Sequence, residues 1–131
     1  MSPNEELRGK RILVVDDQST DATAILLKTV LNVDIDKLCT FVGSGKEAIE
    51  KVVASTDLYG GQNCGFKLIL MDCNMPMLDG YQTTSTIREF LFKNEITQPI
   101  ISAITGHTQK IYVDKAMASG MNQVLTKPID P

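Results

Sequence analysis

The chain has 131 residues, a hydrophobic fraction of 43% and a net charge of −3, from 13 Lys and Arg against 16 Asp and Glu. This size suits one domain with one core, and the lack of net positive charge argues against direct contact with nucleic acid. No run approaches the roughly 18 apolar residues of a membrane-spanning helix, and the first residues lack the apolar core of a secretion signal, so we expect a cytoplasmic protein without a membrane segment.

Short apolar runs alternate with helical patterns along the chain. The runs that predict strands are residues 11–15, 39–42, 66–71, 99–104 and 124–126. Helices are predicted around residues 22–30, behind a capping box at 44–47, around 81–91, and over about 108–119 with Gly120 as the C-terminal cap. The polar, glycine-rich segment 55–65 is predicted to be a surface loop. Strands that alternate with helices imply a doubly wound α/β fold with a parallel sheet.

Polar side chains follow the expected strands at the points where the strands end. Asp16 and Asp17 follow the first run, Asp72 follows the third, and the last two runs lead into Thr105 and Lys127. Because the carboxyl ends of parallel strands share one edge of the sheet, these residues should converge on one crevice. Three neighbouring carboxylates repel one another unless a cation neutralises them or a proton is shared, and such a cluster of oxygens suits Mg²⁺.

This constellation favours phosphoryl transfer. An aspartate can act as the nucleophile, and the reaction mainly needs positioning and neutralisation of charge. Asp72 is the expected acceptor because it ends the strand expected at the centre of the sheet. Lys127 can pair with the phosphoryl oxygens, and the Thr105 hydroxyl can donate a hydrogen bond to them. A single Asp or Lys-Pro at such a place is typical of a turn, but four strands that all end in this way favour a site.

The motifs that carry a family resemblance lie at these strand ends. They are VVDDQ at 14–18, LILMDCNMPMLDG at 68–80, ISAITG at 101–106 and LTKPI at 125–129. In order and spacing they resemble the receiver domains of two-component response regulators, most of all those attached to hybrid histidine kinases. The resemblance implies a flavodoxin-like five-stranded sheet of order 2-1-3-4-5. We therefore expect residues 1–9 to be an N-terminal extension and residues 10–131 to be the receiver domain.

The resemblance also implies the chemistry of signal transduction. Asp72 would accept a phosphoryl group from a phosphohistidine of a histidine kinase or a histidine phosphotransfer protein, and the domain would then switch conformation. Thr105 would supply the switch hydroxyl, and Lys127 would contact the phosphoryl group. The domain would catalyse its own phosphorylation and dephosphorylation instead of turning over a free substrate. The residues that would hold Mg²⁺ are Asp16, Asp17, Asp72 and Asn74, the last through its backbone carbonyl.

Two features depart from the family's pattern. Val124 stands where the family usually has Phe or Tyr, which puts the aromatic part of the usual switch in doubt. The chain ends at Pro131, where the family's last helix would begin, so we expect a C-terminally truncated domain that lacks this helix. The face left uncovered would favour either self-association or low stability. The cysteines form no CxxC pair and are expected to be reduced and mostly buried.

Three other functions use part of the same pattern. A phosphatase of the haloacid-dehalogenase type also uses an aspartate nucleophile and Mg²⁺, but its usual second acid, two residues after the nucleophile, is Asn74 here. Turnover of a free phosphate ester would reveal such an enzyme. A degenerate receiver that serves only as an interaction module would not need intact acids and Lys127. A flavin-binding protein can share the sheet order, but no phosphate-cradling loop follows the first strand.

Overall fold

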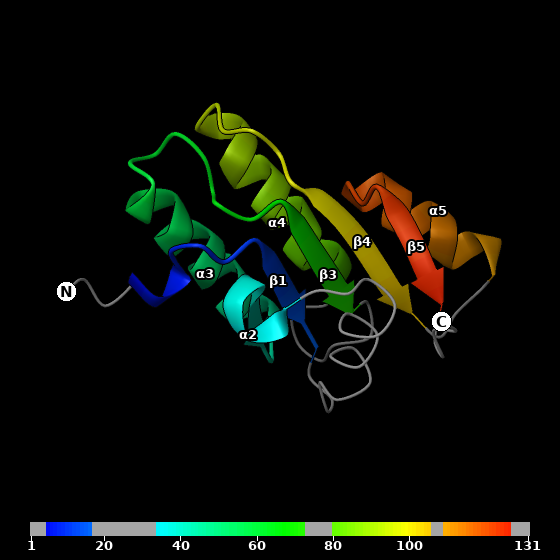
Figure 1. Cartoon of the computed structure of the whole chain (residues 1–131). Helices are drawn as coiled ribbons and strands as arrows, with labels where there is room; N and C mark the ends of the chain where they lie inside the picture. Colours follow the sequence, from blue (N-terminus) through cyan, green and yellow to red (C-terminus); the bar gives the residue numbers. More distant parts are fainter. Residues whose placement is uncertain (1–4, 17–33, 73–79, 106–108, 127–131) are drawn as a thin grey trace.

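The computed structural model describes residues 5–16, 34–72, 80–105 and 109–126. Five strands form one parallel sheet in the order β2-β1-β3-β4-β5 (Figure 1). The strands are β1 (Ile12–Val15), β2 (Cys39–Val42), β3 (Leu68–Asp72), β4 (Ile100–Thr105) and β5 (Gln123–Thr126). The helical segments of the described part are η1 (Glu5–Leu7), α2 (Ile35–Leu38), α3 (Gly45–Leu58), α4 (Gly80–Lys93) and α5 (Lys110–Ser119). The predicted flavodoxin-like fold and its strand order are confirmed.

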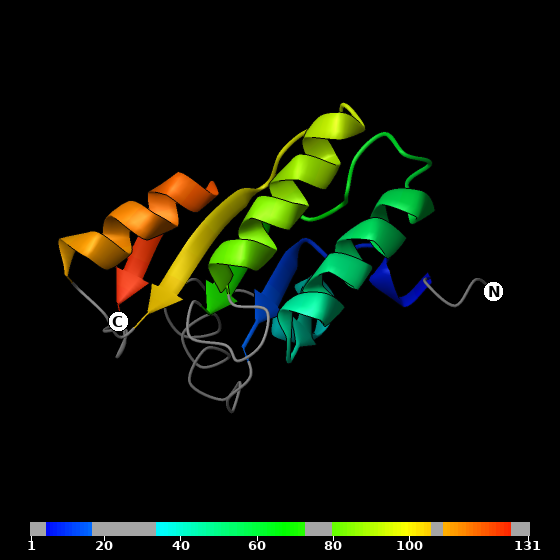
Figure 2. The same ribbon diagram turned by 180° about the vertical axis from the view of Figure 1, so that it is seen from behind.

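Both faces of the sheet contribute to buried clusters. Helices α3, α4 and α5 cover one face (Figure 2), and Leu13 and Ile69 belong to the main core cluster on that side. Val14 and Leu70, the next residues along the same strands, belong to a second cluster. Successive side chains of a strand point to opposite faces, so a strand buried on both faces must be apolar throughout. This is the physical reason for the uninterrupted apolar runs at β1 and β3.

The core also includes a residue from the N-terminal segment. Leu7 of η1 is 1% exposed and lies in the main cluster. The backbone N–H of Lys10 donates to the carbonyl of Leu7 at 3.0 Å, which closes the turn that leads into β1. The nine residues expected as an extension before the domain therefore supply at least one core side chain.

The ends of two helices follow the predicted caps. The Ser44 Oγ accepts a hydrogen bond from the Glu47 N–H at 3.2 Å, which is half of the predicted capping box at the start of α3. Helix α5 ends at Gly120, whose φ of 109° lies in the left-handed region that favours glycine. The predicted helix around residues 22–30 lies outside the described residues.

Helix α3 is longer than the sequence pattern indicates. It continues to Leu58, so the prediction of a loop is wrong for residues 55–58, and the loop begins only after them. Ser55 and Thr56 are buried on the helix, where the Thr56 hydroxyl donates to the Val52 carbonyl at 2.8 Å. Polar residues on the packed side of a helix interrupt the amphipathic pattern that sequence reasoning uses. Within the described ranges, no helix combines the length and apolar character that crossing a bilayer requires.

Candidate functional site

The register of the strands places two of the predicted acids side by side. Val15 of β1 pairs with Met71 of β3, and these two strands are neighbours at the centre of the sheet. Asp16 and Asp72 are the next residues along the two strands, so they stand opposite each other at the carboxyl edge. Neighbouring strands lie about 4.8 Å apart, and residues opposite each other project from the same face. The two carboxylates therefore start from backbone positions about one strand spacing apart.

Two threonines extend the same edge. Asp72 pairs with Ile104, and the following residue, Thr105, pairs with Thr126. Thr105 is the last residue of β4, one position beyond the level of Asp72. Thr126 is the last residue of β5 and immediately precedes Lys127. Three of the predicted site residues, Asp17, Asn74 and Lys127, lie outside the described residues.

Both described acids are buried. Asp16 is 6% exposed and Asp72 is 1% exposed. The backbone N–H of Asp16 donates to the Val42 carbonyl at 3.1 Å, which continues the pairing of β1 with β2 as far as this acid. The described residues contain no group of three His, Cys, Asp or Glu side chains that could hold a metal ion, and Asp16 and Asp72 are the described members of the predicted metal site. Two neighbouring carboxylates away from water favour a cation between them.

Val124 occupies the position that departs from the receiver pattern. It lies on β5, pairs with Ala103 of β4 and packs, partly buried, against the main core cluster. Its side chain is short and branched at Cβ, so it has few rotamers. A change of its χ1 would move little surface compared with an aromatic ring.

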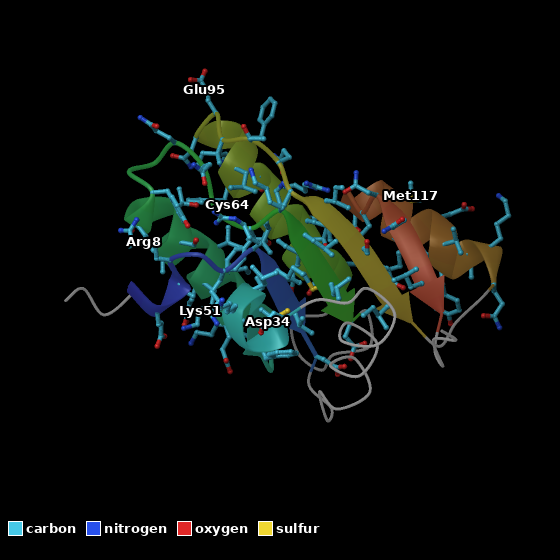
Figure 3. All side chains as sticks on the ribbon, in the orientation of Figure 1. Arg8, Asp34, Lys51, Cys64, Glu95 and Met117 are labelled. Atoms are coloured by element: carbon cyan, nitrogen blue, oxygen red, sulfur yellow. The ribbon has the colours of Figure 1, made fainter. Side chains whose placement is uncertain are left out.

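The described cysteines are structural. Cys39 and Cys64 are free and buried, as predicted. Cys64, labelled in Figure 3, lies in the loop between α3 and β3. Burial raises the pKa of both thiols above the ordinary value. The Cys64 Sγ donates to the Phe66 carbonyl at 3.4 Å. A protonated, buried thiol is a poor nucleophile, so neither cysteine is a candidate nucleophile for the site at the carboxyl edge of the sheet. Cys73 lies outside the described residues.

Sequence reasoning missed one polar side chain that makes several long-range hydrogen bonds. The side chain of Arg88 in α4 donates hydrogen bonds to four residues. Gln98 and Pro99 lie in the turn before β4, and Gly120 and Asn122 lie in the turn between α5 and β5. A lone arginine in a helical pattern carries no signal that distinguishes it from a solvated surface residue. Its neighbour in α4, Glu89, illustrates this because it is exposed and pairs with Lys93 across one turn.

Comparison with known proteins agrees with this geometry. The chain matches the model of the response regulator receiver domain family over residues 12–131. It is 31% identical to hybrid signal transduction histidine kinase A of Dictyostelium discoideum over 120 residues, which are 92% of this chain and 5% of that protein. It is 36% identical to histidine kinase CKI1 of Arabidopsis thaliana over 137 aligned positions, 98% of this chain and 12% of that kinase. The chain thus spans only a small part of these relatives.

Two solved structures are also similar. The receiver domain of CKI1 from Arabidopsis thaliana, complexed with Mg²⁺ and BeF₃⁻, aligns with a TM-score of 0.74 and 31% identity over 95% of this chain and 85% of that one. A chain from the co-crystal structure of the Saccharomyces cerevisiae phosphotransfer protein Ypd1 with the receiver domain of Ssk1 aligns with a TM-score of 0.67. In that alignment the identity is 29%, over 92% of this chain and 80% of that one.

The fold and its acidic edge define a doubly wound α/β domain of the receiver class. This chain belongs to the response regulator receiver domain family. The predicted kinship with receivers of hybrid histidine kinases is confirmed by the kinases that it matches.

Proposed function

We propose that Asp72 is the phosphoacceptor of this receiver domain, and that the donor is a phosphohistidine of a histidine kinase or a histidine phosphotransfer protein. The buried pair of Asp16 and Asp72 at the carboxyl edge of the central strands is the observation that carries the proposal. The co-crystal structure of Ypd1 with the Ssk1 receiver domain supports the class of partner. The proposed setting is the cytoplasm, where such donors meet receivers.

The donor set of the edge fits Mg²⁺. Hard cations of this size bind one or two carboxylates and keep several waters, and Asp16 and Asp72 provide such oxygens on adjacent strands. Asp17 and the backbone carbonyl of Asn74 would complete the protein ligands. When bound, Mg²⁺ would neutralise the negative charge of the phosphoryl oxygens. The CKI1 receiver, crystallised with Mg²⁺ and BeF₃⁻, supports this assignment.

The chain's own residues would position and protect the phosphoryl group. A carboxylate oxygen of Asp72 forms a bond to phosphorus, while the bond from phosphorus to the donor's histidine nitrogen breaks and the imidazole keeps the electron pair. The burial of Asp72 restricts the approach of water and so slows hydrolysis of the acyl phosphate. Lys127 would pair with the phosphoryl oxygens, and the Thr105 hydroxyl would donate a hydrogen bond to them.

That hydrogen bond would be the switch. A new charge-assisted bond from Thr105 favours one rotamer of the threonine and draws the segment after β4 towards the site. Because Val124 replaces the usual aromatic residue, the change on β5 itself should be small.

The experiment that tests this proposal is labelling with a small phosphodonor. The protein is incubated with acetyl phosphate and Mg²⁺, and mass spectrometry measures the intact mass and maps the modified peptide. We expect the mass gain of one phosphoryl group, located at Asp72 and absent without Mg²⁺. Asp72→Asn keeps the shape of the side chain and removes the nucleophile, so this variant should not be labelled.

A matched control separates loss of the nucleophile from loss of charge. Asp57→Asn removes an exposed acid of α3 and should leave labelling at the wild-type level. Undiminished labelling of Asp72→Asn would overturn the assignment of the acceptor. Release of phosphate from a free phosphate ester over many turnovers would favour the dehalogenase-type alternative.

A further inference from the structure

The ring of Tyr59 is fixed at the place where helix α3 ends. Tyr59 is the C-cap residue of α3, and its backbone N–H donates to the Ser55 carbonyl at 3.1 Å. Its ring lies against Gly65, because a Cβ atom at Gly65 would lie only 2.5 Å from the Tyr59 Cε2. The φ of Gly65 is 79°, so the backbone also favours glycine there. The loop between α3 and β3 therefore leaves the ring little freedom.

The hydroxyl of Tyr59 accepts hydrogen bonds from the segment that leads into β1. The backbone N–H of Gly9 donates to the Tyr59 Oη at 3.3 Å, and the Arg11 Nη1 donates to the same oxygen at 3.1 Å. Both hydrogen bonds are exposed to solvent. The same segment is also attached through Leu7, whose side chain lies in the main core cluster. Tyr59 thus joins the end of α3 to a segment about 50 residues away in the sequence.

The surroundings of the Tyr59 oxygen favour negative charge. The hydrogen bond from Gly9 lowers the pKa of the Tyr59 phenol, and the hydrogen bond and charge of Arg11 act in the same direction. Arg8, labelled in Figure 3, adds a second positive charge, with its guanidinium carbon 5.9 Å from the centre of the ring. Partial burial acts in the opposite direction without reversing the shift. The phenol oxygen therefore lies between two arginines and a backbone donor.

The acidic side chains of the neighbouring elements leave this charge in place. Glu6 of η1 pairs with Lys51 of α3, with the Lys51 Nζ 3.8 Å from the Glu6 Oε1. Asp57, two residues before Tyr59, is exposed to water, which screens its charge. Among the described side chains, the charges that act on the Tyr59 phenol are those of the two arginines.

Tyr59 can be reached from solvent. Its side chain is half-buried, and residues 60–62, which follow it, are exposed. A Cβ atom at Gly60 or Gly61 would meet nothing within 4 Å, so this turn stands clear of the rest of the described structure. An enzyme that binds a tyrosine together with the residues after it can therefore hold this turn without displacing core side chains.

Tyr59 is remote from the predicted phosphoacceptor. Helix α3 follows β2 and runs back against the strands (Figure 1), so Tyr59 lies at the edge of the sheet from which the strands start. Strand β1 begins at Ile12, directly after Arg11, at that same edge. Asp72 ends β3 at the opposite edge. A group held at Tyr59 therefore neither touches Asp72 nor depends on its chemistry.

We propose that Tyr59 is a second phosphorylation site of this domain, modified by a protein tyrosine kinase. The Tyr59 oxygen forms a bond to the terminal phosphorus of a nucleoside triphosphate, and the phenol proton passes to a base of the kinase. The bond from that phosphorus to the bridging oxygen breaks, and the nucleoside diphosphate leaves with the electron pair. The phosphoryl group then accepts from the Gly9 N–H and the Arg11 guanidinium, with Arg8 beside it. Arginines and backbone N–H groups are common partners of phosphate in proteins.

The modification tightens the attachment of the segment before β1. A phosphoryl group brings a charge of about −1.5 to −2 at pH 7 and three acceptor oxygens in place of one neutral hydroxyl. Hydrogen bonds between ionised groups are roughly twice as strong as neutral ones, and a guanidinium can bind two phosphate oxygens at once. Residues 7–11 are therefore held more firmly to the end of α3 when Tyr59 is phosphorylated.

Labelling of the folded protein tests whether Tyr59 is an acceptor. The kinase is a purified protein tyrosine kinase that modifies a synthetic peptide of residues 54–64, and the protein is incubated with it, ATP and Mg²⁺. Hydroxylamine then removes any acyl phosphate from Asp72, and mass spectrometry maps the stable phosphate. We expect one phosphoryl group on Tyr59, which Tyr59→Phe loses and the matched control Tyr112→Phe keeps. If the kinase labels the peptide but not the folded protein, the site is overturned.

Phosphorus NMR tests whether the arginines hold the phosphate. Neighbouring cations favour the dianion, so the second pKa of the phosphate should be lower in the phosphorylated protein than in the phosphorylated peptide. Arg11→Gln should remove most of this difference. Lys46→Gln, which removes an exposed cation at the other end of α3, is the matched control and should leave it intact. The same titration in protein and peptide, or a difference that survives in Arg11→Gln, would overturn the proposed contacts.

Amide hydrogen exchange provides an independent measurement of the attachment. The Lys10 N–H donates to the Leu7 carbonyl within the segment that Tyr59 holds. Its exchange should become at least about threefold slower when Tyr59 is phosphorylated, and the Arg11→Gln protein should show a smaller effect. Unchanged exchange at 69–71 of β3 confirms that the fold is intact. An exchange rate of Lys10 that phosphorylation does not alter would show that the phosphate does not bind this segment.

Discussion

Replacement of Asp16 by Asn tests whether the acidic pair is a cation site built at the expense of stability. Asn has the shape of Asp but no charge, so it removes the repulsion between the two neighbouring buried acids. We expect Asp16→Asn to be more stable than the wild type when Mg²⁺ is absent. The wild type should gain stability when Mg²⁺ is added, and the variant should lose most of that gain.

The magnitude follows from the spacing of the strands. Two unit charges about 5 Å apart, at an effective dielectric constant of about 20, repel each other by about 3 kcal/mol. Partial compensation by other groups reduces this figure, so we expect a gain of about 1–3 kcal/mol. An unfolding entropy of about 2.1 cal/mol/K per residue converts 1 kcal/mol into about 3–4 °C for a chain of this length. The melting temperature in EDTA should therefore rise by about 4–10 °C.

Thermal unfolding followed by circular dichroism, in EDTA and in millimolar Mg²⁺, measures both effects. Asp114→Asn is the control, because Asp114 is exposed and its ion pair with Lys110 contributes little. Its melting temperature should stay close to that of the wild type, and its response to Mg²⁺ should be unchanged. The reasoning would be refuted by a wild type whose melting temperature is the same in EDTA and in Mg²⁺, or by an Asp16→Asn protein less stable than the wild type in EDTA.

Three further predictions concern the scaffold. Glu95, just after the end of α4 (Figure 3), has a φ of 57°, which is costly for a residue with a Cβ. Glu95→Gly should therefore raise the melting temperature by about 2–4 °C, and Glu95→Ala should not. Equal effects of the two substitutions would contradict this. The buried Ser55 hydroxyl has no hydrogen-bond partner in the described part of the chain, so Ser55→Ala should raise the free energy of unfolding in urea by about 1 kcal/mol. Thr56→Val loses the hydrogen bond to the Val52 carbonyl and should lower the free energy of unfolding. A loss of stability in Ser55→Ala would show that the hydroxyl does have a partner. Burial raises the pKa of Cys64, so folding favours the protonated thiol, and its contribution to stability is complete below the unfolded pKa and is lost as the pH rises through the folded one. Alkylation of native Cys64 should accordingly be much slower than in urea, and comparable rates would show that the thiol is accessible.

The sequence by itself determined the order of the five strands and of helices α3, α4 and α5, and it placed acidic residues at the carboxyl edge of the sheet. Strand β2 was predicted with its observed bounds, Cys39–Val42, from a short, largely apolar run that leads into Gly43 and Ser44. Ser44 and Gly120 mark helix ends through local hydrogen bonds and local backbone geometry, which need no partner from elsewhere. The acids at 16 and 72 could be assigned to one edge because parallel strands all end on the same side.

Only the tertiary structure decided what depends on packing between distant segments. Ser55 and Thr56 have the composition of a loop, yet they continue α3 because the helix packs against the rest of the core. The burial of Asp72 results from its place on the central strand, between β1 and β4. Arg88 becomes an anchor only when the fold brings the C-terminal end of α5 and the turn before β4 within reach of one guanidinium. A local sequence pattern reflects the backbone preferences of residues that are close in sequence. The contacts of Arg88, Asp72 and Ser55 instead join residues that are close only in the folded structure.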